Sequence, residues 1–239
     1  LDGDDEWRPG FLEAIVKLRQ CFPQAGLYGT GYTTVYSPRF GVDTTLRKAV
    51  DVEQCLVNDY FQKARIAGFI WSSAQAVPRQ IYEQAGWFAE QAPMGTDQDM
   101  WGRIALKYPI AYDCRLLSVY RNDAAGRVVR LWRNKPTMPP FVQTVRRAMQ
   151  NDEIAQQSLP AVYEYVNYIL FNYLQRVMAA NDRAELRRTL RQEFYPTNVY
   201  RRKMKLLKTA SFCLPPYVIY LITRMYNSRW ISFFKHNVE

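Results

Sequence analysis

Histidine and paired cysteines are nearly absent from this sequence. The chain has one histidine, His236, and four cysteines that lie far apart without a C-x-x-C pair: Cys21, Cys55, Cys114 and Cys213. A zinc site needs clustered soft ligands, so this pattern argues against one. Four reduced thiols in a cytoplasmic protein are the expectation that remains.

Long apolar runs are also missing. No stretch approaches the ~20 apolar residues that a membrane-spanning helix needs, and we find no secretory signal, internal repeat or low-complexity segment. The composition is that of a globular protein, with 48% hydrophobic and 15% aromatic residues in a chain of 239. This length suffices for one sizeable core or two small ones.

Acidic residues are scarce toward the C-terminal end, and the formal net charge of the chain is +10. Between positions 201 and 239 lie eight Lys or Arg residues and one acidic residue, beside an apolar and aromatic segment. This combination is typical of a helix in the headgroup region of an anionic membrane. The alternative is that these helices pack on the rest of the protein and that the lysines form a solvated face.

Two acidic clusters stand out against this basic background. Asp2-Gly3-Asp4-Asp5 opens the chain, and Asp97-Gln98-Asp99 lies near its middle. One such cluster can hold a divalent cation against a diphosphate, and the other can supply a carboxylate base. Hard oxygen ligands favour Mg or Mn as the cation. The alternative is that these aspartates occupy helix N-termini, which favour acidic side chains.

The residues around both clusters resemble family 2 glycosyltransferases in three motifs that recur in the family's order. They are Leu1-Asp2-Gly3-Asp4-Asp5-Glu6-Trp7 followed by residues 9–13, Val77-Pro78-Arg79 leading to residues 82–88, and Gly95-Thr96-Asp97-Gln98-Asp99-Met100-Trp101-Gly102-Arg103. The resemblance covers about residues 1 to 127. It implies a GT-A type fold and a metal-dependent, inverting transfer of a sugar from a nucleotide-diphosphate sugar to a hydroxyl acceptor.

On the donor side, the resemblance assigns the metal to Asp2 and Asp4, and donor contacts to Asp2, Asp5 and Arg121. In the family, a nucleotide-binding half precedes the Asp-x-Asp motif with which this chain begins. We therefore expect a fragment that is inactive by itself and represents the acceptor half of the catalytic domain. Arg121 has an ordinary solvent-facing role as its alternative.

On the acceptor side, the resemblance makes Asp97 the base that removes the proton from the acceptor hydroxyl. It assigns acceptor contacts to Asp99, Trp101 and Gly86, although a tryptophan at helical spacing is more often a core residue. Thr96 departs from the family, which usually has Glu there, and the segment 120–123 replaces a stretch that often contains histidine. The expected acceptor is a glycan or a lipid-linked molecule of cell-envelope or extracellular glycan synthesis.

Helices and strands are expected to alternate in the first half. Hydrophobic spacing and turn residues predict helices beginning near Pro9 and ending before Pro23, and over 52–67, 78–86 and 97–108, strands over 27–36, 69–77 and 110–120, and a loop over 37–50. The second half is predicted to be helical over 140–150, 159–180, 183–193 and 198–213. We thus expect an α/β domain over 1–134 and a basic helical extension over 135–239 that associates with a membrane.

The functional expectation is therefore a cytoplasmic glycosyltransferase, located peripherally on the inner face of the plasma membrane. Two alternatives stay open. One is a metal-dependent nucleotidyl or phosphoryl transferase, which also uses paired carboxylates on a metal. The other is a non-enzymatic helical module in which the basic tail binds a membrane, and we do not expect nucleic acid as a partner.

Overall fold

The computed structural model describes residues 1–36, 45–47, 52–66, 68–124 and 135–224. The chain divides into two compact units. The first consists of Leu1–Val128 and Pro139–Tyr165, and the second of Val129–Met138 and Val166–Glu239. The predicted boundary at residue 134 differs from this division, because residues 139–165 pack within the first unit.

The first unit is a mixed α/β unit. Its elements are β1 (Glu6–Trp7), α1 (Phe11–Cys21), β2 (Leu27–Val35), β3 (Thr45–Arg47), β4 (Cys55–Val57), α2 (Tyr60–Ile66), the 3-10 turn η2 (Ser72–Ala74), β5 (Gln75–Ala76), α3 (Arg79–Ala85), α4 (Thr96–Lys107), β6 (Ile110–Arg121), α6 (Pro140–Gln150), the 3-10 turn η3 (Gln156–Ser158) and the start of α7 (Leu159–Ala179).

Two long parallel strands, β2 and β6, form the centre of the sheet, with Leu27 opposite Ile110 at one end and Val35 opposite Arg121 at the other. Short antiparallel strands flank them: β1 and β4 pair with β6, and β3 and β5 pair with β2. The register shifts around Gly31, where a Cβ would press against the carbonyl oxygens of β6. The sheet is thus mixed, with parallel pairing confined to its two central strands.

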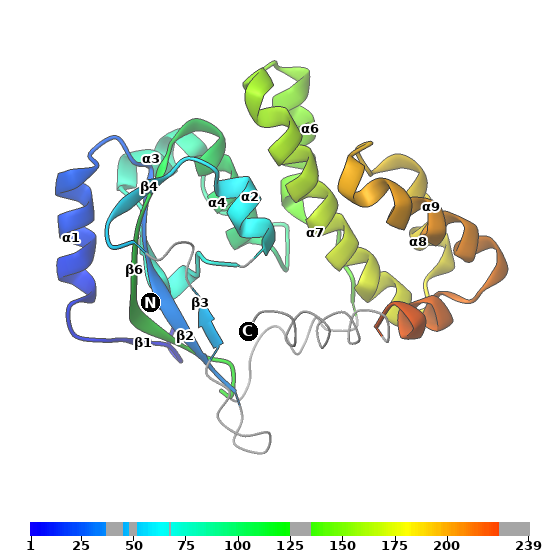
Figure 1. Ribbon diagram of the computed structural model, residues 1–239, viewed down its shortest axis with the longest axis horizontal. Helices are drawn as coiled ribbons and strands as arrows, with labels where there is room; N and C mark the ends of the chain where they lie inside the picture. Colours follow the sequence, from blue (N-terminus) through cyan, green and yellow to red (C-terminus); the bar gives the residue numbers. More distant parts are fainter. Residues whose placement is uncertain (37–44, 48–51, 67, 125–134, 225–239) are drawn as a thin grey trace. The chain divides into compact units, whose positions relative to one another are not determined.

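Helices cover both faces of this sheet (Figure 1), with α1 on one side and α2 and α4 on the other. Leu18 of α1 packs with Tyr28 and Ala111, one from each central strand. On the other face, Tyr112 meets the ring of Phe69 at 5.4 Å between centroids. Neighbouring strand residues therefore enter opposite cores, as the two-residue period of a strand requires.

An aromatic cluster joins α2, α6 and the first turns of α7 within the first unit. The Phe61 ring stacks on that of Phe141, and Tyr165 lies against the rings of both. Helix α6 also approaches α4 closely at Gly102, where a Cβ would collide with the Phe141 ring. The α4–α6 packing therefore depends on the missing side chain at position 102.

The second unit is helical in its described part. It contains the rest of α7, α8 (Arg183–Gln192), α9 (Asn198–Cys213) and a further helical stretch over residues 216–224. Its core is a cluster of apolar residues from these helices, among them Leu174, Met178, Leu186 and Leu207. Among the described residues, no helix combines the length and the apolar character that crossing a membrane requires.

The four helices predicted in the second half and the predicted strands that became β2 and β6 are confirmed to within about two residues. Three predictions were wrong. Residues 55–57 form a strand on the edge of β6, so the predicted 52–67 helix begins only at Tyr60. In the predicted 69–77 strand, only Gln75 and Ala76 pair, after a 3-10 turn.

The third wrong prediction concerns the 37–50 loop, in which residues 45–47 pair with β2. The remaining positions of this predicted loop lie outside the described residues. These corrections share one reason, because the central strands offer unpaired edges whose backbone groups need hydrogen-bond partners. Short segments that pass beside those edges pair with them.

Candidate functional site

The N-terminal acidic segment is held to the sheet unit at two points. The backbone N–H of Asp2 donates to the Ser73 hydroxyl at 2.9 Å, and the indole of Trp7 donates to the Ser73 carbonyl at 2.6 Å. Glu6 and Trp7 then pair with β6 opposite Val119 and Ser118. The Asp-x-Asp motif is therefore positioned by η2 on one side and by the edge of β6 on the other.

Asp5 is buried and anchors this segment. Its Oδ2 accepts from the Trp71 indole at 2.7 Å, and its Oδ1 accepts from the backbone N–H of Arg121 at 3.0 Å. Nothing in the sequence singles out Trp71 and Ser73, and both were missed as residues that position the site. The Asp5 carboxylate thus has a structural role, and its predicted donor contact stays a prediction.

The helix-capping alternative for Asp4 and Asp5 is wrong. Helix α1 begins at Phe11, its N-cap is Gly10 in the left-handed conformation (φ 89°), and no side chain caps it. Pro9 lies before this cap, outside the first helical turn where the sequence placed it. Among the described residues, the Asp4 side chain is exposed and forms no hydrogen bond or ion pair, so it is available to a ligand.

Asp97 lies in the first turn of α4, directly after the N-cap Gly95 and Thr96. Its Oδ1 accepts from the backbone N–H of Gln98 at 2.8 Å. Partial burial raises the pKa of the Asp97 carboxyl above its usual value, and the bonds from the helix N–H groups oppose this only in part. The helix N-terminus interpretation of Asp97 is therefore confirmed, and its role as a base stays a prediction with which the raised pKa is compatible.

The charge of Asp97 reaches the N-terminal acidic segment, where it is the smallest of the causes that shift the pKa of Asp2. The pKa of Asp2 is raised by partial desolvation, then by the charges of Asp5 and Asp4, and also by that of Asp97. A carboxylate repels another measurably only across a short distance. Asp2 and Asp97 thus share one acidic region although 94 residues separate them in the sequence.

The charge of Asp97 extends to the aromatic core as well. The pKa of the Tyr60 hydroxyl is raised, mainly because the group is buried. The negative charge of Asp97 is a smaller cause of the same shift. The charge of Asp97 is therefore felt both at Tyr60 and at Asp2.

Asp99 has other partners than Asp97, because residues two apart on a helix point in different directions. Its Oδ1 accepts from the Thr144 hydroxyl at 2.6 Å and its Oδ2 accepts from Arg103 at 3.0 Å. Arg103 in turn donates to the carbonyls of Ala85, Gly86 and Trp87. Asp99 is buried and fixes the loop after α3, so any effect on an acceptor would pass through that loop.

Gly86 and Trp101 are the other predicted acceptor contacts, and both have structural roles in the fold. Gly86 ends α3 with φ 81°, a conformation that glycine adopts readily. Trp101 is 2% exposed and packs edge-on against Phe88. The prediction that Trp101 stacks on a sugar is therefore wrong, because its ring faces are covered by the core.

An exposed aromatic residue beside this loop was missed. Trp87 is 61% exposed and stacks on the Tyr82 ring at 5.4 Å between centroids. It borders a cavity of about 440 Å³ that Asp99, Arg103 and Arg147 also line. The signal in the sequence was an aromatic residue directly after a glycine at a helix end, which is where exposed rings occur.

Arg121 pairs with acidic side chains on the surface. Its guanidinium contacts Glu6 at 2.8 Å and lies 4.0 Å from Asp123. This is the ordinary role that the sequence left open as an alternative to a donor contact. Its backbone N–H, which holds Asp5, is the part of Arg121 that organises the site.

The acidic segment offers few protein ligands for a divalent cation. Among the described residues, no three His, Cys, Asp or Glu side chains form a metal-binding group. Mg²⁺ is commonly bound by one or two carboxylates together with phosphate oxygens and water. Asp2 and Asp4 supply two hard oxygen ligands in a region whose surplus negative charge already raises the pKa of Asp2.

Comparison with known protein families and with curated proteins found no match. The sequence matches no model of a known protein family. It also has no significant match among curated proteins. The resemblance to family 2 glycosyltransferases therefore depends on the sequence motifs alone.

Proposed function

We propose that this chain is the acceptor half of a GT-A type glycosyltransferase that transfers a sugar from a nucleotide-diphosphate sugar, with inversion and with a divalent metal. The observation that supports the proposal is that the segment of Asp2, held by Ser73 and by the edge of β6, lies within reach of the charge of Asp97 in the first turn of α4. A metal-holding carboxylate and a base must face one reaction centre, and a pair from distant segments that share one acidic region supports this arrangement.

In this proposal, Asp2 and Asp4 hold Mg or Mn. The bound cation neutralises the negative charge that develops on the diphosphate leaving group. Asp5 keeps the segment in place through Trp71 and β6, and Ser73 fixes the backbone of Asp2. The acidic segment is therefore held in position before the donor binds, which lowers the cost of organising the site.

Asp97 accepts the proton of the acceptor hydroxyl as that oxygen attacks the anomeric carbon from the face opposite the leaving group. Its raised pKa makes it a stronger base than an ordinary aspartate, and the helix N–H groups keep the carboxylate oriented. Asp99 and Arg103 position the loop at Gly86 and Trp87 on the acceptor side. The acceptor is a glycan or lipid-linked hydroxyl.

The test uses an enzyme in which this chain follows a nucleotide-binding half. We expect metal-dependent release of the nucleoside diphosphate and a product of inverted anomeric configuration, both followed by NMR. Asp97→Asn should lower kcat by roughly 100- to 10,000-fold and leave donor affinity nearly unchanged, because the amide accepts no proton. Asp152→Asn, an exposed change in the same unit, is the matched control.

Three results would contradict the proposal. Release of inorganic pyrophosphate in place of a nucleoside diphosphate would favour the nucleotidyl transferase alternative. Unchanged turnover in Asp97→Asn would remove Asp97 from the role of base. Loss of donor binding in the same variant would assign Asp97 to the donor side instead.

A further inference from the structure

The outward side of α9 in the second unit has an unusual mixture of side chains. Leu206 is 71% exposed and Phe212 is 61% exposed. They alternate along the helix with the exposed basic residues Arg202, Lys205 and Lys208. We call these five residues the α9 face. Leu206 lines an apolar groove together with Ile222, which is also exposed, and exposed apolar side chains that gather in this way mark an interaction site.

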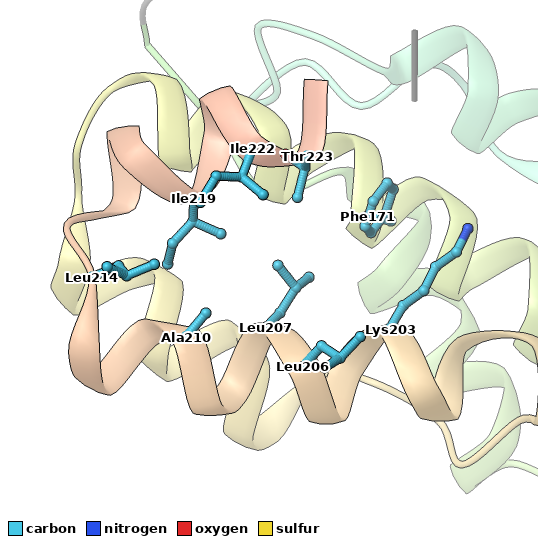
Figure 2. Close-up of a pocket in the computed structure, with 9 residues that line it drawn as sticks. All are labelled: Phe171, Lys203, Leu206, Leu207, Ala210, Leu214, Ile219, Ile222 and Thr223. Carbon is cyan, nitrogen blue, oxygen red and sulfur yellow. The ribbon is translucent and has the colours of Figure 1, made fainter. Parts of the chain in front are cut away.

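An apolar groove borders this face (Figure 2). It lies between α9 and the helical residues 216–224, has a volume of about 390 Å³, and receives Leu207, Ile219 and Ile222 from its two sides. Lys203 stands at its rim, with its ammonium 5.5 Å from the centre of the Phe171 ring. The groove thus combines an apolar floor with a cation at its edge.

The charge around the groove has one sign. Positions 194–224 contain six Lys or Arg residues and no Asp or Glu. Among the described residues, Arg202, Lys205 and Lys208 form no ion pair, hydrogen bond or ring contact through their side chains. These cations therefore have no role within the described fold, unlike Arg187 of α8, which donates to the Ser211 carbonyl at 3.0 Å.

We infer that the α9 face and its groove bind the surface of an anionic phospholipid bilayer. Lysine and arginine beside exposed apolar side chains match the headgroup region, where the cations meet lipid phosphates and the apolar groups reach the acyl chains. Nucleic acid would match the positive charge of this surface, but it would leave the apolar side chains of Leu206, Phe212 and Ile222 without a partner. This inference is independent of sugar transfer, because it concerns other residues and needs no substrate.

The test is flotation of the full chain with vesicles of phosphatidylcholine, with and without phosphatidylglycerol. We expect binding only to the anionic vesicles, and weaker binding as salt is raised. Lys205→Ala with Lys208→Ala should weaken binding by roughly tenfold or more, and Leu206→Ser with Phe212→Ser by roughly tenfold. The matched control is Leu12→Ser with Val16→Ser, which are 62% and 55% exposed on α1.

Two exposed cysteines give a second readout on the unaltered chain. Cys213 ends α9 and Cys21 ends α1. Anionic vesicles should slow maleimide labelling of Cys213 and leave that of Cys21 unchanged. Circular dichroism of each variant shows that the fold is retained, so that a loss of binding reports the surface.

Three outcomes would overturn the inference. Equal binding to neutral and anionic vesicles, or equal loss in the α1 control, would show that binding is nonspecific. A dimer in solution that Leu206→Ser with Phe212→Ser separates would assign the α9 face to a second copy of the chain. A Cys213 that is unreactive in dilute protein without vesicles would mean that another segment of the same chain already covers it.

Discussion

One glutamate of the second unit and two aspartates of the first have pKa values shifted in opposite directions. In the second unit, Glu185 accepts from the Tyr173 hydroxyl at 2.7 Å, from Thr189 at 3.0 Å and from Arg188 at 2.6 Å. The bonds from Arg188 above all lower the pKa of Glu185 to about 2. In the first unit, the pKa values of Asp2 and Asp97 are raised, mainly by desolvation, and for Asp2 the charge of the N-terminal amino group opposes this only in part.

The number of hydrogen-bond donors around each carboxylate accounts for this difference. A carboxylate with several donors favours the folded state in its charged form, and little of its capacity remains for a ligand. A carboxylate that is partly desolvated and close to like charges disfavours the folded state when ionised, and it persists where a cation or a proton is to be bound. The same side-chain chemistry thus has two uses within one chain.

The largest effect on stability is expected where the carboxylate is fully satisfied. Glu185→Gln should lower the free energy of unfolding by about 2 to 3 kcal/mol at pH 7, because the charged bonds to Arg188 are lost. Chemical denaturation measures this. Glu83→Gln is the control, since its ion pair with Arg79 is exposed and surface pairs contribute about 0 to 1 kcal/mol.

The pH dependence of the Glu185 variant sharpens the same prediction. The folded-state pKa is lowered from 4.5 to about 2, so the stabilising contribution is present above pH 4.5 and is lost as the pH falls toward 2. The difference between wild type and Glu185→Gln should therefore shrink across this window. A difference that stays constant down to pH 2 would mean that packing, rather than charge, causes the loss.

An intermediate effect is expected at the proposed metal site. Asp4→Ala should weaken Mn²⁺ binding to the donor-bound enzyme by on the order of tenfold, because one of two charged oxygen ligands is removed. Calorimetry with and without Mn²⁺ measures it. Asp59→Ala, which removes an exposed carboxylate of the same unit, should leave the affinity unchanged, and an equal effect of both variants would refute the assignment.

The smallest effect is expected on stability at Asp97, and it has the opposite sign. Asp97→Asn should raise the free energy of unfolding at pH 7 slightly, because the ionised form is disfavoured in the folded state. The gain should develop as the pH rises from 3.8 through the raised folded-state pKa, and vanish below 3.8. Thermal melts across this range measure it, and a loss of stability would place Asp97 with Glu185.

The sequence predicted the elements whose signals are local. Helices α6 to α9 have apolar residues at helical spacing, and α8 also begins with Asp182, whose side chain accepts from the Glu185 N–H at 2.9 Å. The short strands β3, β4 and β5 could not be predicted in this way. Each has two or three residues, and its conformation depends on hydrogen bonds offered by β2 or β6.

The residues of the candidate site likewise differ in whether their role can be predicted from local sequence. Asp97 at a helix start and the exposed Asp-x-Asp motif are local patterns, and the sequence found both. The partners of Asp5 are 66 and 116 residues away, so its anchoring role is visible only in the fold. Trp101 was misassigned for a related reason, since its burial depends on Phe88 and the surrounding core, which helical spacing alone does not reveal.

The close approach of α6 to α4 at Gly102 limits where this protein can be divided. A polypeptide that stops at residue 134, where the composition of the chain changes, would lack the Phe141 ring that fits over Gly102 and the Thr144 hydroxyl that bonds Asp99. Helix α4 would then expose its inner side to water. A fragment designed to contain the first unit should therefore retain α6 and the first turns of α7.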